Sequence, residues 1–117
     1  MANTGEFLTT TETTLNDHHV VERYGVVRGI AVRSRSAVGL LGAKLQQFFG
    51  GDITILRELC ERTRSDAFSD AIDHARSMGA NALVGVRYDA TEIMPGVSEV
   101  ICYGTAMRVV KQRTAAA

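Results

Sequence analysis

Four segments of the chain carry hydrophobic patterns that predict regular structure. Residues 20–32 are rich in Val and Ile and contain no Pro, which is typical of a β-strand. Residues 53–78 repeat apolar or small residues every three or four positions, which predicts a long helix. Residues 82–89 and 99–107 predict two further strands, joined by a turn at Pro95–Gly96. The expected order of elements is therefore strand, helix, strand, strand.

Glycines mark the expected ends of the long helix. Gly79 follows its last apolar residue and is expected to adopt the left-handed conformation that ends many helices. Gly50–Gly51 precede the helix, and Asp52 is expected to cap its first turn. Residues 37–49 predict a shorter helix, which two internal glycines weaken.

The side-chain patterns also predict which faces pack together. In the first strand the odd positions carry the smaller side chains, which would let a helix approach closely: Val21, Gly25, Val27, Gly29 and Ala31. The buried helix stripe is expected at Leu56, Cys60, Thr63, Ala67, Ala71, Ala75 and Met78. Strict alternation in the second strand places Ala82, Val84, Val86 and Tyr88 on one face.

The last strand is largely apolar on both faces. One face is expected to carry Val100, Cys102, Gly104 and Ala106, and the other Ile101, Tyr103, Thr105, Met107 and Val109. Gly104 in mid-strand indicates close approach of another backbone. One helix covers only one face of a sheet, so we expect a second copy of the chain to bury the other.

Composition narrows the classes of protein that fit. The 117 residues are enough for one domain, expected over residues 15–110. Residues 1–14 are expected to be weakly ordered, with a short edge strand at Phe7 and Leu8, and residues 111–117 to form a tail. Thirteen basic residues balance thirteen acidic ones, which argues against a nucleic-acid partner. The chain has no apolar run of ~20 residues and no secretory signal pattern, so we expect no membrane partner and a cytoplasmic location.

Four glycine-containing segments, taken together, resemble the YbjQ-like family. They are Gly25-Val26-Val27-Arg28-Gly29, Gly50-Gly51-Asp52, Gly79-Ala80-Asn81-Ala82 and Tyr103-Gly104-Thr105-Ala106. The resemblance runs from Phe7 to Val109 and implies an α+β subunit of the dodecin-like type, with order β-α-β-β. It further implies a three-stranded antiparallel sheet covered by one long helix. Additional short strands and the short helix would then serve in assembling a homopentameric ring.

The family label refers to heavy-metal binding, which directs attention to the two cysteines. Cys60 and Cys102 are the candidate metal ligands, because thiolates bind soft metal ions well. The alternative, which we favour, is that both pack in the core as small hydrophobic residues. Many relatives have a Tyr-Glu pair early in the long helix, where this chain has Leu56 and Arg57, so no role is carried over from that pair.

Other polar groupings have simpler explanations. His18–His19 lie on opposite strand faces and are expected in an exposed turn, although repetition around a ring would create a shared site. His74 with Asp70 fits an acid–base or metal pair, but neighbouring acidic residues favour a solvated acidic face. Gly50–Gly51 before a helix resembles an anion site and is explained equally by helix breaking. Glu92 and Glu99 flank the hairpin turn and do not make a hydrolase without a cleft.

The sequence therefore favours a cytoplasmic, homo-oligomeric protein, expected to be a pentamer, that binds a small ligand and has no catalytic activity. A soft metal ion is one candidate ligand. The alternative is a structural or adaptor oligomer that binds another protein and no small ligand.

Overall fold

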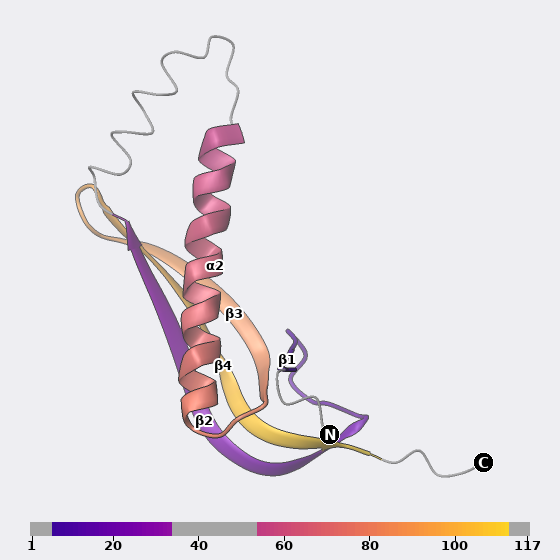
Figure 1. The fold of residues 1–117 in the computed structure, drawn as a ribbon. Helices are drawn as coiled ribbons and strands as arrows, with labels where there is room; N and C mark the ends of the chain where they lie inside the picture. The colour runs from indigo at the N-terminus through magenta and orange to yellow at the C-terminus, as the bar shows by residue number, and fades with distance from the viewer. Residues whose placement is uncertain (1–5, 34–53, 113–117) are drawn as a thin grey trace.

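One long helix crosses one face of a four-stranded sheet (Figure 1). The computed structural model describes residues 6–33 and 54–112. The elements are β1 (Leu8–Thr9), β2 (His18–Arg33), α2 (Thr54–Ser77), β3 (Ala82–Met94) and β4 (Val97–Lys111). The expected helix at residues 37–49 and the expected cap at Asp52 lie outside the described residues.

The sheet has the strand order β1-β3-β4-β2. Strands β2, β4 and β3 are antiparallel neighbours, and β1 adds a parallel pairing to β3 through Leu8 and Thr9. The expected α+β class and three-stranded antiparallel sheet are therefore confirmed, and the short edge strand is present as β1. No element of the described residues is a helix with the length and apolar character of a membrane span.

Small residues let α2 lie close against β2. Ala67, Ala71 and Ala75 have no exposed surface, and a Cβ at Gly29 would overlap the Ala67 carbonyl oxygen and the Ala71 amide nitrogen. The smaller face of β2 therefore meets the helix, as the alternation predicts. The same face of β4 contributes Cys102 and Ala106 to this core.

The two ends of the expected buried helix stripe differ from its middle. Cys60 and Met78 are exposed, whereas the residues between Thr63 and Ala75 on the stripe are buried. The side chain of Leu56 lies outside the described residues.

Val21 on β2 is exposed, although it is expected on the face toward the helix. A register shift between Val20 and Glu22 interrupts the alternation of that strand.

The C-terminus of α2 closes with the hydrogen bonds of a Schellman motif. The Ala80 N–H donates to the Ala75 carbonyl at 3.1 Å, and the Gly79 N–H donates to the Arg76 carbonyl at 3.0 Å. Gly79 has φ 96°, the left-handed conformation that the sequence predicts at this position. Because β3 begins at Ala82, this motif sets the direction in which the chain enters the sheet.

A β-bulge at Gly85 corrects the expected alternation in β3. Gly85 has φ 64°, and the β3–β4 register shifts between Val84 and Arg87. Val86 consequently packs with Leu83 under the helix, while Ala82 and Val84 belong to a second cluster. Tyr88, which pairs with Cys102, lies on the helix face as well. The predicted common face of these residues is therefore wrong beyond Val84.

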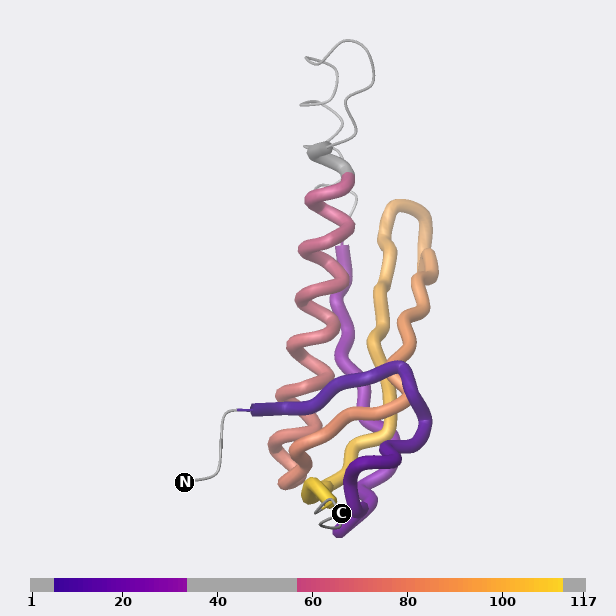
Figure 2. Tube along the Cα trace, turned by 90° about the vertical axis from the view of Figure 1, so that its right-hand side faces the viewer, coloured from indigo at the N-terminus to yellow at the C-terminus, as the bar shows by residue number. Residues whose placement is uncertain are grey.

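The two edges of the sheet are covered in different ways, one by a backbone segment and the other by helix side chains. The segment around β1 runs along the first half of β3, where the Gly85 N–H donates to the Glu12 carbonyl at 2.7 Å and the Val86 N–H to that of Thr10 at 3.1 Å. Figure 2 shows this N-terminal segment crossing beside β3. Along β2 it is side chains of α2 that reach the free edge.

Three residues of α2, spaced one turn apart, bind this edge of β2. A carboxylate oxygen of Asp70 accepts from the Ile30 N–H at 3.1 Å, and Nδ1 of His74 lies 3.2 Å from the Arg28 carbonyl oxygen. Asp66 forms an ion pair with Arg33 at 2.6 Å. The three helix residues, Asp66, Asp70 and His74, are called the edge clasp below.

Candidate functional site

The two cysteines occupy very different environments. Cys60 is exposed on α2, whereas Cys102 on β4 has no exposed surface. Cys60 precedes Ala67 by seven residues, about 10 Å along a helix that rises 1.5 Å per residue. Cys102 packs in the core cluster that contains Ala67. The part of α2 that covers Cys102 therefore lies further along the helix than Cys60.

Cys102 has Tyr88 as its polar neighbour. Burial raises the pKa of the Cys102 thiol, and the hydrogen bond with Tyr88 opposes this change. The pKa of Tyr88 is raised, first by burial and then by the neighbouring Cys102. The guanidinium of Arg64 lies 5.6 Å from the centre of the Tyr88 ring. This arrangement favours a neutral thiol, which is a poor metal ligand.

The described part of the chain does not provide a complete heavy-metal site. No three His, Cys, Asp or Glu side chains among residues 6–33 and 54–112 come together in a metal-binding group. His74 and Asp70 serve the edge clasp instead, and His18 and His19 are separated by the alternation of β2. Of the two cysteines, Cys60 is the exposed thiol.

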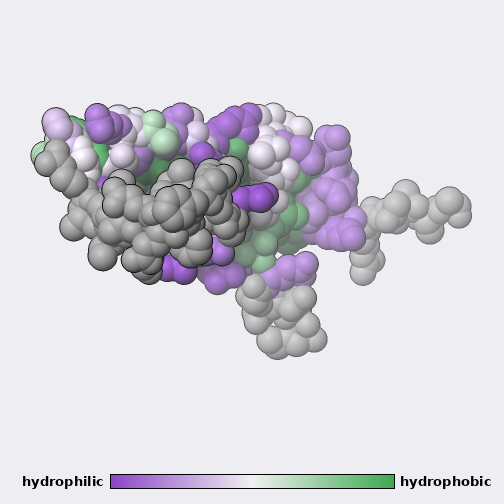
Figure 3. Space-filling model, turned by 90° about the horizontal axis from the view of Figure 1, so that it is seen from above, coloured by the Kyte–Doolittle hydropathy of each residue, from purple (hydrophilic) through white to green (hydrophobic). Residues whose placement is uncertain are grey.

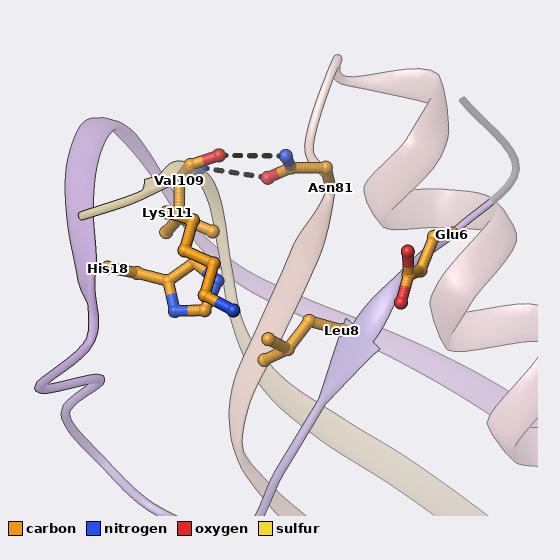
Figure 4. A pocket seen from close by; sticks show the side chains of 6 residues that line it. All are labelled: Glu6, Leu8, His18, Asn81, Val109 and Lys111. Atoms are coloured by element: carbon orange, nitrogen blue, oxygen red, sulfur yellow. Dashed lines mark hydrogen bonds between the residues drawn. The ribbon is translucent and has the colours of Figure 1, made fainter. Parts of the chain in front are cut away.

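A pocket of about 400 Å³ lies at the end of the sheet, where β1, the start of β2, the start of β3 and the end of β4 meet. Figure 4 shows its six lining side chains. They are Glu6, Leu8, His18, Asn81, Val109 and Lys111. Leu8 and Val109 are apolar, and the remaining four bring charged or hydrogen-bonding groups.

Asn81 holds one wall of the pocket in place. Its side-chain amide donates to the Val109 carbonyl at 2.9 Å, and its side-chain oxygen accepts from the Val109 N–H at 2.8 Å. Its backbone also accepts from the Leu8 N–H at 3.0 Å. This residue, which directly precedes β3, therefore connects β1 and β4.

His18 is oriented by its neighbour Asp17. Nδ1 of His18 lies 2.8 Å from a carboxylate oxygen of Asp17, and this hydrogen bond is the main reason why the pKa of Asp17 is lowered. Only 15% of the His18 side chain is exposed, compared with 71% for Asp17. Because Nδ1 is engaged by Asp17, Nε2 is the ring nitrogen that remains for a ligand.

Sequence patterns identify one pocket residue, His18, and miss the others. Glu6 and Lys111 come from opposite ends of the chain and meet only because β1 and β4 both neighbour β3. Asn81 resembles an ordinary turn residue in the sequence, and its double hydrogen bond to Val109 depends on a contact across 28 positions. Only the topology of the sheet brings these residues together.

The fold and the pocket define a small α+β protein with a ligand-sized hollow at one end of its sheet. The chain belongs to the YbjQ-like family, because the family model described as "Putative heavy-metal-binding" matches residues 7–110. The resemblance drawn from the glycine-containing segments is thereby confirmed.

Curated relatives agree with this assignment over almost the whole chain. A UPF0145 protein of Solibacter usitatus is 57% identical over 105 residues, which cover 90% of this chain and 93% of the relative. UPF0145 proteins of Burkholderia mallei and Burkholderia pseudomallei are each 54% identical over 104 residues, covering 89% of this chain and 94% of theirs.

Proposed function

We propose that the protein is a homo-oligomeric, cytoplasmic binding protein for a small ligand, without catalytic activity of its own. The number of subunits that the family resemblance implies is five. The observation that carries the proposal is the sheet face opposite α2, which no element of the described chain covers along the β3–β4 hairpin. Figure 3, a view from above, shows hydrophobic residues at the surface between hydrophilic ones.

The register of the sheet identifies the residues of this open face. Residues directly opposite in an antiparallel pair share a face. One row across β2, β4 and β3 is therefore Arg28, Tyr103 and Arg87, and the next is Ile30, Ile101 and Asp89. On β2 the aliphatic members are strongly exposed, with Val26 at 69%, Ile30 at 43% and Val32 at 48%.

These aliphatic side chains on one strand favour burial by another surface. Fully burying a Val or Ile side chain contributes about 1.5–3 kcal/mol relative to leaving it in water. A second copy of the chain is the simplest partner, because each copy carries both the basic row at Arg28 and the acidic position at Asp89, and these attract opposite charges on a neighbouring copy.

Light scattering and one pair of variants test the assembly. The unaltered protein is expected to have the mass of five subunits. Ile30→Lys introduces a charge on the open face and should lower the mass. Ser69→Lys, at an exposed position of α2, is the matched control and should leave it unchanged. A monomeric unaltered protein at micromolar concentration would exclude a homo-oligomer.

A soft metal ion is the second candidate ligand, and the family description favours it. The exposed Cys60 would supply a thiolate from each of several copies. Native mass spectrometry of protein purified without a metal-affinity tag reports any bound ion together with the subunit number. Loss of a tightly bound ion in Cys60→Ala would support this candidate. A full-length oligomer that binds neither ion nor small molecule would instead support the alternative of an adaptor for another protein.

A further inference from the structure

The charged groups of the pocket at the end of the sheet are arranged with opposite signs on different elements. His18 and Lys111 are direct partners in the β2–β4 ladder, so their side chains share one face. Glu6 comes from the segment before β1, on another side of the hollow (Figure 4). The pocket therefore has the ammonium of Lys111 beside the imidazole of His18 on one side and the carboxylate of Glu6 on another.

Apolar side chains lie between these charged groups. Leu8 and Val109 line the hollow and pack with the second core cluster, whose other members include Val84 and Met107. Val109 is fixed by its two backbone hydrogen bonds to Asn81, at 2.8 and 2.9 Å. The hollow thus has a rigid apolar floor and charged groups at its rim, which is the usual design of a small-molecule site.

The charges also indicate which ligands the pocket disfavours. The ammonium of Lys111 would repel a metal cation, and the carboxylate of Glu6 would repel a polyanion such as a polyphosphate. A volume of about 400 Å³ holds on the order of a dozen water-sized atoms, at ~30 Å³ for each. The matching ligand is small and carries separated charges or polar groups.

We propose that this pocket binds a short-chain carboxylate that carries an ammonium or hydroxyl group at its other end. The carboxylate contacts the ammonium of Lys111, the hydrocarbon chain lies on Leu8 and Val109, and the donor group faces Glu6. The proposal rests on the proposed small-ligand function and gives the ligand its chemical class.

Titration of the oligomer with three matched probes, followed by the methyl NMR signals of Leu8 and Val109, tests the proposal. The probes are 6-aminohexanoate, hexanoate and hexylamine, which share a six-carbon chain and differ in their end groups. We expect 6-aminohexanoate to bind most tightly, hexanoate more weakly and hexylamine most weakly. Tightest binding of hexylamine, or no shift of either methyl signal with any probe, would overturn the proposal.

Two variants assign the end groups of the probe to side chains. Lys111→Gln should weaken both carboxylates by about tenfold or more, since a hydrogen bond to a charged group is lost. Glu6→Gln should remove the advantage of 6-aminohexanoate over hexanoate and should not weaken the binding of hexanoate itself. Arg62→Gln removes an exposed cation on α2 and serves as the control.

The test of ligand binding in the pocket can fail or succeed independently of the test of homo-oligomer assembly. Carboxylate affinities that are unchanged in a Lys111→Gln variant that still has the mass of the unaltered oligomer would overturn the pocket proposal alone. A monomer whose methyl signals still respond to 6-aminohexanoate in the expected order would support the pocket and overturn the assembly.

Discussion

Two glycines control how closely the helix and the strands of this chain pack. Gly29 lies directly under the backbone of α2, at Ala67 and Ala71. Gly104 lies under β3, where an added Cβ would be 2.8 Å from the Val84 carbonyl oxygen. The close backbone approach that the sequence predicts at Gly104 is therefore confirmed, and the partner is the neighbouring strand β3 of the same chain.

Replacing Gly29 with Ala is expected to lower the free energy of unfolding by about 2–3 kcal/mol, because the methyl group has no space and α2 must move. Urea unfolding followed by circular dichroism measures the change. Gly25→Ala is the matched control. A Cβ at this position would have no atom within 4 Å, so there is space for it. Because Gly25 has φ 97°, which is unfavourable for Ala, we expect a smaller decrease in the free energy of unfolding, of about 1 kcal/mol. If the two variants are equally stable, α2 does not pack directly against Gly29 in solution.

The two thiols should differ in reactivity. A small disulfide reagent at pH 8 is expected to modify one thiol per subunit rapidly, because Cys60 is exposed and Cys102 has no exposed surface. Cys60→Ala should abolish the rapid phase, and urea should release the second thiol. Rapid modification of both thiols in the folded protein would contradict the buried position of Cys102.

At the scale of elements, the edge clasp explains how a long edge strand is protected without a neighbouring strand. Asp70 and His74 engage backbone groups of Ile30 and Arg28 that would otherwise be free to pair with another chain. Asp66 adds an ion pair to Arg33 near the end of the strand. Helix side chains thus perform the task that an additional strand performs at the opposite edge, where β1 lies against β3.

Asp70→Ala is expected to increase the hydrogen-exchange rate of the Ile30 amide, which loses its acceptor, and to cost about 1 kcal/mol of stability. Amide exchange measured by NMR reports this position directly. Asp73→Ala, an exposed acidic residue on the same helix, is the control and should leave the Ile30 amide unaffected. An unchanged rate in Asp70→Ala would mean that the clasp does not form in solution.

The sequence predicts the positions of the helix and strands well, but it predicts poorly which residues of neighbouring elements contact one another. Periodicity in residues 53–78 and the β-branched run in residues 20–32 give α2 and β2 almost to the residue, because both patterns report local geometry. Gly85 is the one sign in the sequence of the bulge that turns Val86 and Tyr88 to the helix face.

The edge clasp could not be predicted from spacing alone. Asp66, Asp70 and His74 have the spacing of a solvated acidic face, and their roles depend on which strand lies beside them. The same holds for the pocket, because Glu6 and Lys111 come together only through the strand order. The roles of Cys60 and Cys102 as metal ligands stay predictions.

At the scale of the whole molecule, the two faces of the sheet differ. Helix α2 covers one face with the buried Ala67, Ala71 and Ala75 (Figure 1), whereas Val26, Ile30 and Val32 of β2 are exposed.

Stability should decrease at alkaline pH. Burial raises the pKa of Cys102 above its ordinary value of 9.0 and that of Tyr88 above 10.0. The unfolded chain therefore releases these protons at lower pH than the folded chain. The contribution to stability is fully present below about pH 9 and is lost as pH rises toward the pKa values of the folded protein.

Denaturant unfolding between pH 8 and 10.5, at one protein concentration, measures this slope. Cys102→Ala should be less stable at every pH and should show a flatter decline, while Cys60→Ala should keep the slope of the unaltered protein. A slope that is the same in all three proteins would show that Cys102 does not titrate differently in the folded and unfolded states.

The ladder between β2 and β4 has a consequence for the order of events in folding. The β3–β4 hairpin closes over two residues, Pro95 and Gly96, and Gly96 has φ 80°. Pairs between β2 and β4 instead join residues 65 positions apart, Arg33 with Ser98, to 93 positions apart, His18 with Lys111. Loop closure costs more entropy as the intervening chain lengthens, so we expect the hairpin to form first and β2 to join last.

Stopped-flow kinetics distinguish this order from its reverse. Gly96→Ala strains the turn and should mainly slow refolding, whereas Val27→Ala in the buried centre of β2 should mainly accelerate unfolding. The opposite assignment of the two variants would mean that the distant strand pairs before the hairpin. In the expected order, the last strand to arrive is the one that carries the exposed aliphatic residues of the open face. A newly made chain would then present those residues on a sheet only after the rest of the subunit had formed, which shortens the time available for premature association.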